Sequence, residues 1–401
     1  MTDTLPPPAL AANRIVDFDI FNPPGVEEDY FAAWQSLQGP GKPALVWTSA
    51  NGGHWIATDG ALIRALWEDH ARFSSACLAV TPGLGEVMAF IPLQLDPPEH
   101  KPYRTAVMKG MASRYITALE PYVEASARDL AEALAPRGAC EFVSDFAEIM
   151  PINIFLSMID VPIEDRPQLR ELGLQLTRPD GSVTVEQLKQ AADDYLAPYV
   201  EARLARPGSD LFSRILAEPI DGRPWQLDEA RRLCRNLLFG GLDTVAAMLG
   251  MVALHLARHP EDQRRLRAQP ALIPDAADEL IRRYPTVSVS RNALVDAEVD
   301  GVRVRRGDIV YLPSVLHNLD PACFEQPEQV DFERRLTPVR HTTMGAGVHR
   351  CVGAALARRE VIAFLQAWLA AVPEFRLDPA RPVRMKGGNV AAATALPLRW
   401  D

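Results

Sequence analysis

The sequence predicts a mainly α-helical protein with small β-sheets, folded as one large domain. Three observations lead to this prediction. The chain has 401 residues, of which 48% are hydrophobic, enough to bury a large core. Its prolines and glycines are scattered in short stretches, so no linker divides the chain. Apolar residues recur at helical spacing over most of the stretch from about residue 113 to 285.

The expected elements follow in order along the chain. Strands are expected at 43–48 and 54–60, and helices at 61–73, 116–136, 185–205 and 227–259. The last of these helices, if unbroken, is long enough to cross a whole domain. Asp300-Gly301 predicts a hairpin between two short strands. The stretch 318–350 has little periodicity, and such a long irregular run in a compact domain indicates a functional segment.

Charge and composition exclude several classes of protein. The net charge of −10 argues against nucleic acid and anionic membranes as partners. The N-terminus has no charged segment followed by an apolar core, so no signal peptide is expected. The apolar run 237–257 has Asp243 at its centre, which predicts a buried helix rather than a membrane span. The five cysteines are far apart and odd in number, which fits a reducing cytoplasm.

One of these cysteines, Cys351, follows a glycine-rich loop and precedes a helical run. Gly345, Gly347 and Gly353 bracket it, and glycine allows positive φ and a close approach of the backbone to another body. Residues 355–372 have helical periodicity, so Cys351 is expected at a helix N-terminus, where free N–H groups favour a thiolate. A thiolate is a nucleophile or a metal ligand. The nucleophile of a hydrolase would need a histidine base, and the nearby His349 is poorly placed for that role.

The segment MGAGVHRCVG, residues 344–353, resembles the haem-binding loop of the cytochrome P-450 family, and the resemblance extends over essentially the whole chain. It implies the triangular-prism fold of that family, in one domain over 1–401, and haem b with Cys351 as its axial thiolate. A thiolate ligand pushes electron density to iron and favours O–O cleavage. The resemblance also implies haem contacts from Gly345 and Gly353, and from Met344 where the family usually has Phe.

Two further segments are weak signals alone and gain meaning from the resemblance. Glu279 and Arg282, in ELIRR, are three apart on one helical face and look like the family's buried Glu-x-x-Arg pair, with Arg334 as its third member and a structural role. FGGLDT, residues 239–244, resembles the oxygen-binding groove. It implies that Gly240 lies against haem. The catalytic residues implied are Thr244 as hydrogen-bond partner of dioxygen, Asp243 as proton source and Arg178 as its relay partner.

The resemblance also implies donors for the two haem propionates. The family places such contacts at His100, Arg104, Arg291 and His349. His100 and Arg104 are four residues apart, so both can lie on one side of a helix.

The nearest resemblance is to the bacterial camphor-hydroxylating branch, carried by FIPLQLDPPEH, LTRPDGS, FGGLDTV, HTTMGAG and ARREVI. That branch binds camphor with a tyrosine whose position is Met88 here, so the donor to the substrate carbonyl is missing. A small apolar cyclic terpenoid or norisoprenoid is therefore expected, with Asn236 or Asn389 as alternative donors. The implied pocket residues are Ala79, Met88, Phe90, Leu93, Asn236, Phe239, Val287, Asn389 and Val390.

The chain has no flavin or iron–sulfur motif, so its electrons are expected from outside. The resemblance implies a small acidic [2Fe–2S] ferredoxin docked over the thiolate face, near Arg64, Lys101, Arg104, Lys109 and Arg350. Two alternatives share the fold: a non-catalytic haem-thiolate sensor and a peroxide-using enzyme. The intact Asp243-Thr244 pair argues against both.

Overall fold

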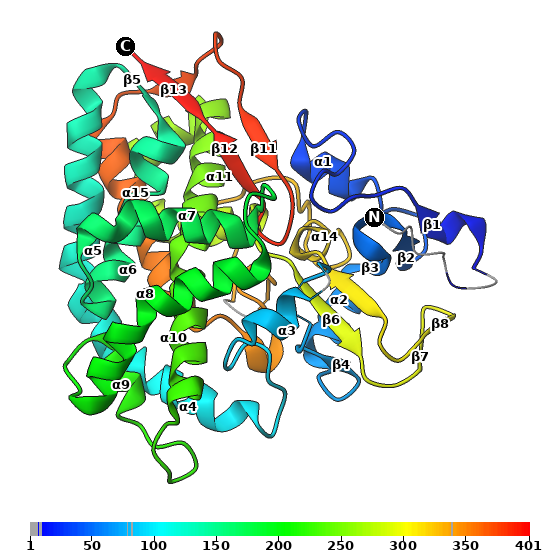
Figure 1. Ribbon diagram of the computed structural model, residues 1–401. Helices are drawn as coiled ribbons and strands as arrows, with labels where there is room; N and C mark the ends of the chain where they lie inside the picture. Colours follow the sequence, from blue (N-terminus) through cyan, green and yellow to red (C-terminus); the bar gives the residue numbers. More distant parts are fainter. Residues whose placement is uncertain (1–6, 8–9, 78, 82, 338–339) are drawn as a thin grey trace.

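The computed structural model describes residues 7, 10–77, 79–81, 83–337 and 340–401. Helices gather on one side of the molecule, and on the other side a sheet lies with a few short helices (Figure 1). The prediction of a mainly helical fold with small sheets is confirmed. The N-terminal residues 1–6, on which the expectation about a signal peptide depends, lie outside the described part of the chain.

The helical side is built around a pair of long helices that pack along their length. These are α5 and α15, and an aromatic cluster of Phe142, Phe146, Phe364 and Trp368 fills the space beside α15. The helices are α1 Tyr30–Gln35, α2 Gly60–Glu68, α3 Leu84–Met88, α4 His100–Gly110, α5 Ser113–Leu134, α6 Met150–Ile159, α7 Arg166–Thr177, α8 Val185–Ala205, α9 Leu211–Leu216, α10 Leu227–Leu242, α11 Thr244–Arg258, α12 Pro260–Ala268, α13 Ile273–Arg283, α14 Ser314–Asn318 and α15 Ala354–Ala371.

The largest sheet has the strand order β1-β2-β3-β9-β6-β4, and three smaller sheets pair β10-β13-β5, β11-β12 and β7-β8. The β7-β8 hairpin turns at Asp300 (φ 50°) and Gly301 (φ 71°), as the sequence predicts. The strands are β1 Ile15–Val16, β2 Leu45–Thr48, β3 His54–Ala57, β4 Phe73–Ser74, β5 Ala139–Glu141, β6 Val289–Ala293, β7 Ala297–Val299, β8 Val302–Val304, β9 Ile309–Leu312, β10 Phe375–Leu377, β11 Arg384–Lys386, β12 Ala392–Ala395 and β13 Pro397–Trp400.

The long helix predicted over 227–259 is interrupted within the segment FGGLDT, residues 239–244, so the condition that it is unbroken is not met. Asp243 has φ −130° and ψ −29° and separates α10 from α11. One turn earlier, the carbonyl of Gly240 accepts a hydrogen bond from Thr244 Oγ1 at 3.1 Å. The stretch Leu227–Arg258 is long and apolar enough to cross a membrane by length and composition, but 72% of its most apolar window is buried inside the protein. It is a core element, as predicted.

Candidate active site

Backbone geometry fixes the loop in front of Cys351. The N–H of Cys351 donates to the carbonyl of Met344 at 2.7 Å. Gly345 (φ 73°) and Gly347 (φ 62°) both adopt the left-handed conformation that favours glycine. A Cβ at Gly347 would lie 3.4 Å from the Cα of Glu68, so the loop packs directly on the end of α2. The loop therefore holds Cys351 just before the first turn of α15.

The ionisation of Cys351 is set by opposing effects. Burial raises the pKa of the Cys351 thiol, while the N–H of Gly353 and the charges of Arg104 and Arg350 lower it. Burial is the larger effect on the pKa, whereas the N–H groups of Gly353 and Ala354 at the start of α15 act in the direction that the sequence predicts. A metal ion that coordinates the sulfur would remove the proton outright.

The surroundings of Cys351 fit a large planar group. Cys351 keeps accessible surface, although enough protein surrounds its thiol to raise the pKa by burial. On α10, Gly240 is also exposed, and a Cβ added there would meet no atom within 4 Å. Because Leu237, Leu238, Phe239 and Leu242 around it are buried, this open position indicates internal space, as the haem of the resembling family requires.

A cluster of buried basic side chains, with one long contact to Asp96, supplies a second test of that fit. His100 and His349 lie with their ring centroids 4.5 Å apart, and Arg291 is almost fully buried. His349 Nε2 is 3.9 Å from Asp96 Oδ1, too far for a hydrogen bond. Within the described residues, His100 Nε2, His349 Nε2 and Arg291 Nε are buried without a hydrogen-bond partner. Such a cluster fits an anionic ligand such as haem propionates.

The same burial depresses the basicity of these groups. Desolvation lowers the pKa of His100 to about 4, with a smaller contribution from His349, and lowers the pKa of Arg291 to about 10. Arg104, the fourth predicted propionate donor, donates from Nη2 to the backbone carbonyl of Arg350 next to the cysteine, and its role toward a propionate stays a prediction. An anion between these groups would raise these pKa values again, because it stabilises the protonated forms.

Asp243 and Arg178 form the buried pair that the sequence predicts. Arg178 donates from Nη2 to Asp243 Oδ1 and from Nη1 to the carbonyl of Val390 at 3.3 Å, and both side chains of the pair are less than 10% exposed. Asp243 Oδ2 has no hydrogen-bond partner among the described residues. A surface cavity lined by both residues of the pair, and by the ion pair Glu148–Arg170, reaches Asp243 from outside.

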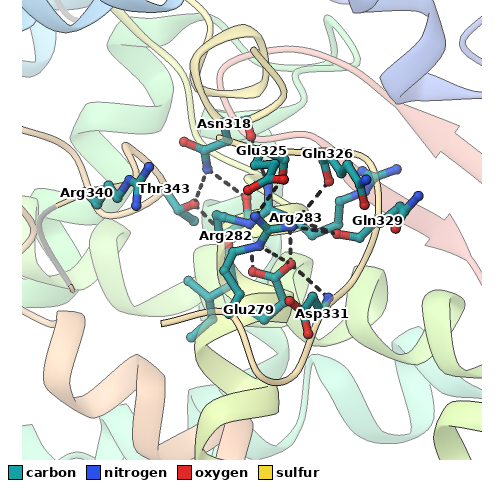
Figure 2. A network of polar contacts seen from close by, with 12 residues as sticks. Glu279, Arg282, Arg283, Asn318, Glu325, Gln326, Gln329, Asp331, Arg340 and Thr343 are labelled. Carbon is teal, nitrogen blue, oxygen red and sulfur yellow. Dashed lines mark hydrogen bonds and ion pairs between the residues drawn. The ribbon is translucent and has the colours of Figure 1, made fainter. Parts of the chain in front are cut away.

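Glu279 and Arg282 form a fully buried pair (Figure 2), and the less buried Arg334 joins them. Arg282 makes two hydrogen bonds of 2.7 Å to the two carboxylate oxygens of Glu279. Arg334 Nε and the N–H of Asp331 add bonds of 3.0 and 3.1 Å to Glu279 Oε1. The sequence brings the first pair together through helical spacing, whereas Arg334 comes from the irregular run before Cys351.

The sequence analysis missed Asn318, which joins this network to the cysteine loop (Figure 2). Asn318 Nδ2 donates to the carbonyl of Arg282 and to Thr343 Oγ1, both at 2.8 Å, and its Oδ1 accepts from the N–H of Thr342 at 2.9 Å. Arg282 in turn donates to the carbonyl of Asn318 at 3.0 Å. Thr342 and Thr343 directly precede Met344, so the network holds the start of the loop. No local motif around Asn318 reveals this role.

The predicted pocket residues fall into two apolar groups. Ala79, Met88, Phe90 and Phe239 belong to the main core, where the rings of Phe90 and Phe239 lie 5.8 Å apart and Leu93 packs at the edge. Val287 and Val390 form a bridge on the other side, packed against Ala247 of α11.

The two asparagines expected as substrate donors differ. Asn236 Nδ2 uses one of its two N–H donors for the carbonyl of Ile91 at 3.0 Å, and its role as a donor to substrate stays a prediction. Asn389 lines a small cavity together with Leu84 and Leu188, and its Oδ1 has no partner within the described chain.

Three of the five predicted ferredoxin contacts lie in one surface groove. Lys101, Arg104 and Lys109 line it together with the exposed side chains of Met108 and Val348. Arg350 is joined to this groove through the bond from Arg104 to its carbonyl. Arg64 lies apart, on α2, where it pairs with Glu68 and donates to the carbonyl of Arg340.

Comparisons with known proteins agree with this geometry. A family model described as "Cytochrome P450" matches residues 271–387. A probable cytochrome P450 127A1 of Sinorhizobium fredii is 34% identical over 98% of this chain and 95% of its own length. The crystal structure of cytochrome P450 CYP101C1 is 70% identical, with a TM-score of 0.93, and covers 99% of this chain and 100% of its own. The crystal structure of CYP101J2 is 37% identical, with a TM-score of 0.91, and covers 99% of this chain and 100% of its own.

Proposed function

This chain belongs to the cytochrome P450 family and is a haem-thiolate monooxygenase, and we propose that it hydroxylates a small apolar cyclic terpenoid or norisoprenoid with dioxygen. We further propose that a [2Fe–2S] ferredoxin supplies the electrons and that the enzyme works in the cytoplasm. The observation that carries the substrate proposal is the pocket wall, where Met88, Phe90 and Phe239 are all buried and apolar.

Cys351 is the proposed iron ligand. The bound haem supplies activation of dioxygen, and a thiolate ligand favours O–O cleavage. The chain contributes the loop that fixes Cys351, the N–H of Gly353 toward its sulfur, and the unpaired donors of His100, His349 and Arg291 for the propionates. Hydrogen bonds and charges near the sulfur tune the metal.

Asp243, Thr244 and Arg178 are the proposed catalytic residues of the chain. Arg178 holds one oxygen of Asp243, which leaves Oδ2 free to accept and pass on a proton from the cavity that reaches it. Thr244 Oγ1 is bonded to the Gly240 carbonyl, beside the open face of α10, and its hydroxyl can redirect that bond toward dioxygen. The acid–alcohol pair favours oxygen chemistry over the peroxide-using alternative.

The groove of Lys101, Arg104, Met108, Lys109 and Val348 is the proposed ferredoxin surface. It combines cationic side chains with exposed apolar ones on a protein whose net charge is −10. A local basic face on an acidic protein steers an acidic partner. Lys109 is partly neutralised by Glu218, at 2.5 Å, so Lys101 and Arg104 are expected to carry most of the attraction.

The substrate class is tested by titrating the holoenzyme with camphor and β-ionone and analysing the products. Met88 offers no hydrogen-bond donor, and a ketone oxygen that loses its water bonds on burial costs about 1–3 kcal/mol. We expect weak, loosely oriented camphor binding, tighter β-ionone binding, and an improvement of about fivefold or more for camphor in Met88→Tyr. Tight oxidation of camphor to one product by the unmodified protein would contradict this pocket assignment.

A further inference from the structure

The segment Met88–Ile91, at the end of α3, is called the pocket wall from here on. Side chains of α10 hold its backbone. Arg235 Nη2 donates to the carbonyl of Met88 at 2.5 Å and Arg232 Nε to that of Ala89 at 2.7 Å. Asn236 Nδ2 donates to the carbonyl of Ile91 at 3.0 Å. Three neighbouring carbonyls of one short segment are thus bound by three side chains of one helix.

These three donors lie on the helix face that also meets the pocket. Positions 232, 235 and 236 are followed at the same helical spacing by Phe239, which packs on Phe90, and by Gly240, where an added Cβ would meet no atom within 4 Å. We call Arg232, Arg235 and Asn236 the clamp. It joins the segment Met88–Ile91 to α10, the helix that also carries the proposed oxygen groove.

The wall needs such donors because its backbone leaves the helical pattern. Ala89 takes a left-handed conformation (φ 47°, ψ 50°) at the end of α3, and the last carbonyls of a helix have no partner within the helix. Gln94 closes the segment from the other side, because its Oε1 accepts from the N–H of Phe90 at 2.7 Å and its Nε2 donates to the carbonyl of Gly85 at 2.9 Å.

Arg235 also connects the wall to a second helix. It is 1% exposed and pairs through Nη1 with Asp193 of α8, which is held in addition by Lys189 at 2.6 Å. A guanidinium can serve a carboxylate and a carbonyl at once because its donors form a fixed fork. A lysine or glutamine at this position offers no such fork.

We propose that Arg235, with Arg232 and Asn236, is a positioning and specificity-determining group that holds the segment Met88–Ile91 against α10 and α8. It acts on the substrate through Met88 and Phe90, whose side chains the fixed backbone orients. The effect on substrate binding rests on the proposed function. The effect on hydrogen exchange in the segment Met88–Ile91 does not.

The test compares the holoenzyme with Arg235→Gln, Arg235→Lys and the control Arg231→Gln. Arg231 is on the same helix, pairs with Glu201 at 2.6 Å and is 37% exposed. Hydrogen exchange without substrate is expected to be tenfold or more faster in peptides covering 84–94 for Arg235→Gln, partly restored in Arg235→Lys, and unchanged in the control. Peptides covering 279–283 are expected to keep the parent rate.

Binding and product analysis give the second readout. Arg235→Gln is expected to raise the dissociation constant of β-ionone about tenfold and to broaden its products. If the parent binds neither β-ionone nor camphor, the substrate proposal fails and the exchange data alone decide the clamp. If Arg235→Gln does not fold, Arg232→Gln replaces it, because the Arg232 side chain is 29% exposed. Hydrogen exchange is then expected to accelerate in the same peptides, by a smaller factor. Unchanged exchange at 84–94, or equal acceleration in all peptides, would overturn the clamp.

Discussion

The Glu279 network and the Asp243 pair are two buried groups of carboxylate and arginine that differ in how completely they are paired. Both oxygens of Glu279 are bonded, to Arg282, Arg334 and the N–H of Asp331. Within the described part of the chain, one oxygen of Asp243 is bonded, to Arg178, and the other is not; the backbone of Asp243 interrupts a helix. Full pairing locks a buried polar network in one arrangement, whereas an unpaired oxygen can exchange partners. The first cluster therefore suits support and the second suits proton transfer.

Among the variants that test this comparison, the one that removes the charge of Glu279 has the largest expected effect on the protein. Glu279→Gln leaves Arg282 and Arg334 facing a neutral amide in the interior, and breaking one partner of a buried pair costs about 3–5 kcal/mol. Urea unfolding is expected to show this loss in the free energy of unfolding. The purified variant is also expected to contain less haem. The control is Glu333→Gln, which removes an exposed pair with Arg265. A loss below 1 kcal/mol would mean that the network does not support the loop.

Glu360 of α15 sharpens the comparison, because this buried carboxyl pairs with no arginine among the residues that the structure describes. Its Oε2 has no partner among the described residues, and burial raises its pKa from 4.5 to about 8. Between pH 4.5 and pH 8 the folded protein keeps this proton, whereas the unfolded chain loses it. The free energy of unfolding therefore falls as pH rises through this range, by about 1.4 kcal/mol per pH unit. Below pH 4.5 no loss remains, and above pH 8 the loss is constant.

Glu360→Gln should therefore be more stable than the parent by a few kcal/mol at pH 8, and the advantage should shrink toward pH 5. Urea unfolding at several pH values measures this difference. Glu374→Gln is the matched control, because Glu374 is half exposed in a surface pair with Arg264. A stability difference that does not change with pH would contradict the raised pKa.

Changing the unpaired acid tests the functional half of the comparison. Asp243→Asn keeps the shape and removes the exchangeable proton, and loss of a positioned acid lowers rates by about 100-fold or more. Product formation is expected to fall by that factor while substrate binding stays near the parent value, and urea unfolding measures the stability that is lost with the buried Arg178 pair. The exposed Asp228 of α10 supplies the control Asp228→Asn. A normal rate in Asp243→Asn would remove this residue from proton delivery.

Thr244→Ala is expected to have the smallest effect, on coupling rather than on rate. Without the hydroxyl beside Gly240, the variant should still consume reductant and oxygen, but product per electron pair should fall severalfold as hydrogen peroxide appears. Oxygen uptake, peroxide and product are measured together. Thr244→Ser, which keeps the hydroxyl, should restore most of the yield, and unchanged coupling in Thr244→Ala would show that the hydroxyl has no role.

The sequence by itself determined the features that depend on neighbouring residues. Helical spacing placed Glu279 beside Arg282, and the glycines before Cys351 predicted a loop that needs positive φ, which Gly345 and Gly347 adopt. The hairpin at Asp300-Gly301 was predictable for the same reason. Each of these signals arises from backbone geometry within a few residues, so the chain carries it without knowledge of the fold.

Only the tertiary structure decided features that depend on contacts between distant segments or on burial. Asn318 reaches Thr342 and Thr343, and Arg235 reaches Met88, although nothing near either residue in the sequence indicates it. The raised pKa of Cys351 likewise follows from desolvation, which outweighs the helix N-terminus that the sequence predicts. Long-range pairing and desolvation depend on which surfaces the folded chain brings together, and local spacing carries no record of them.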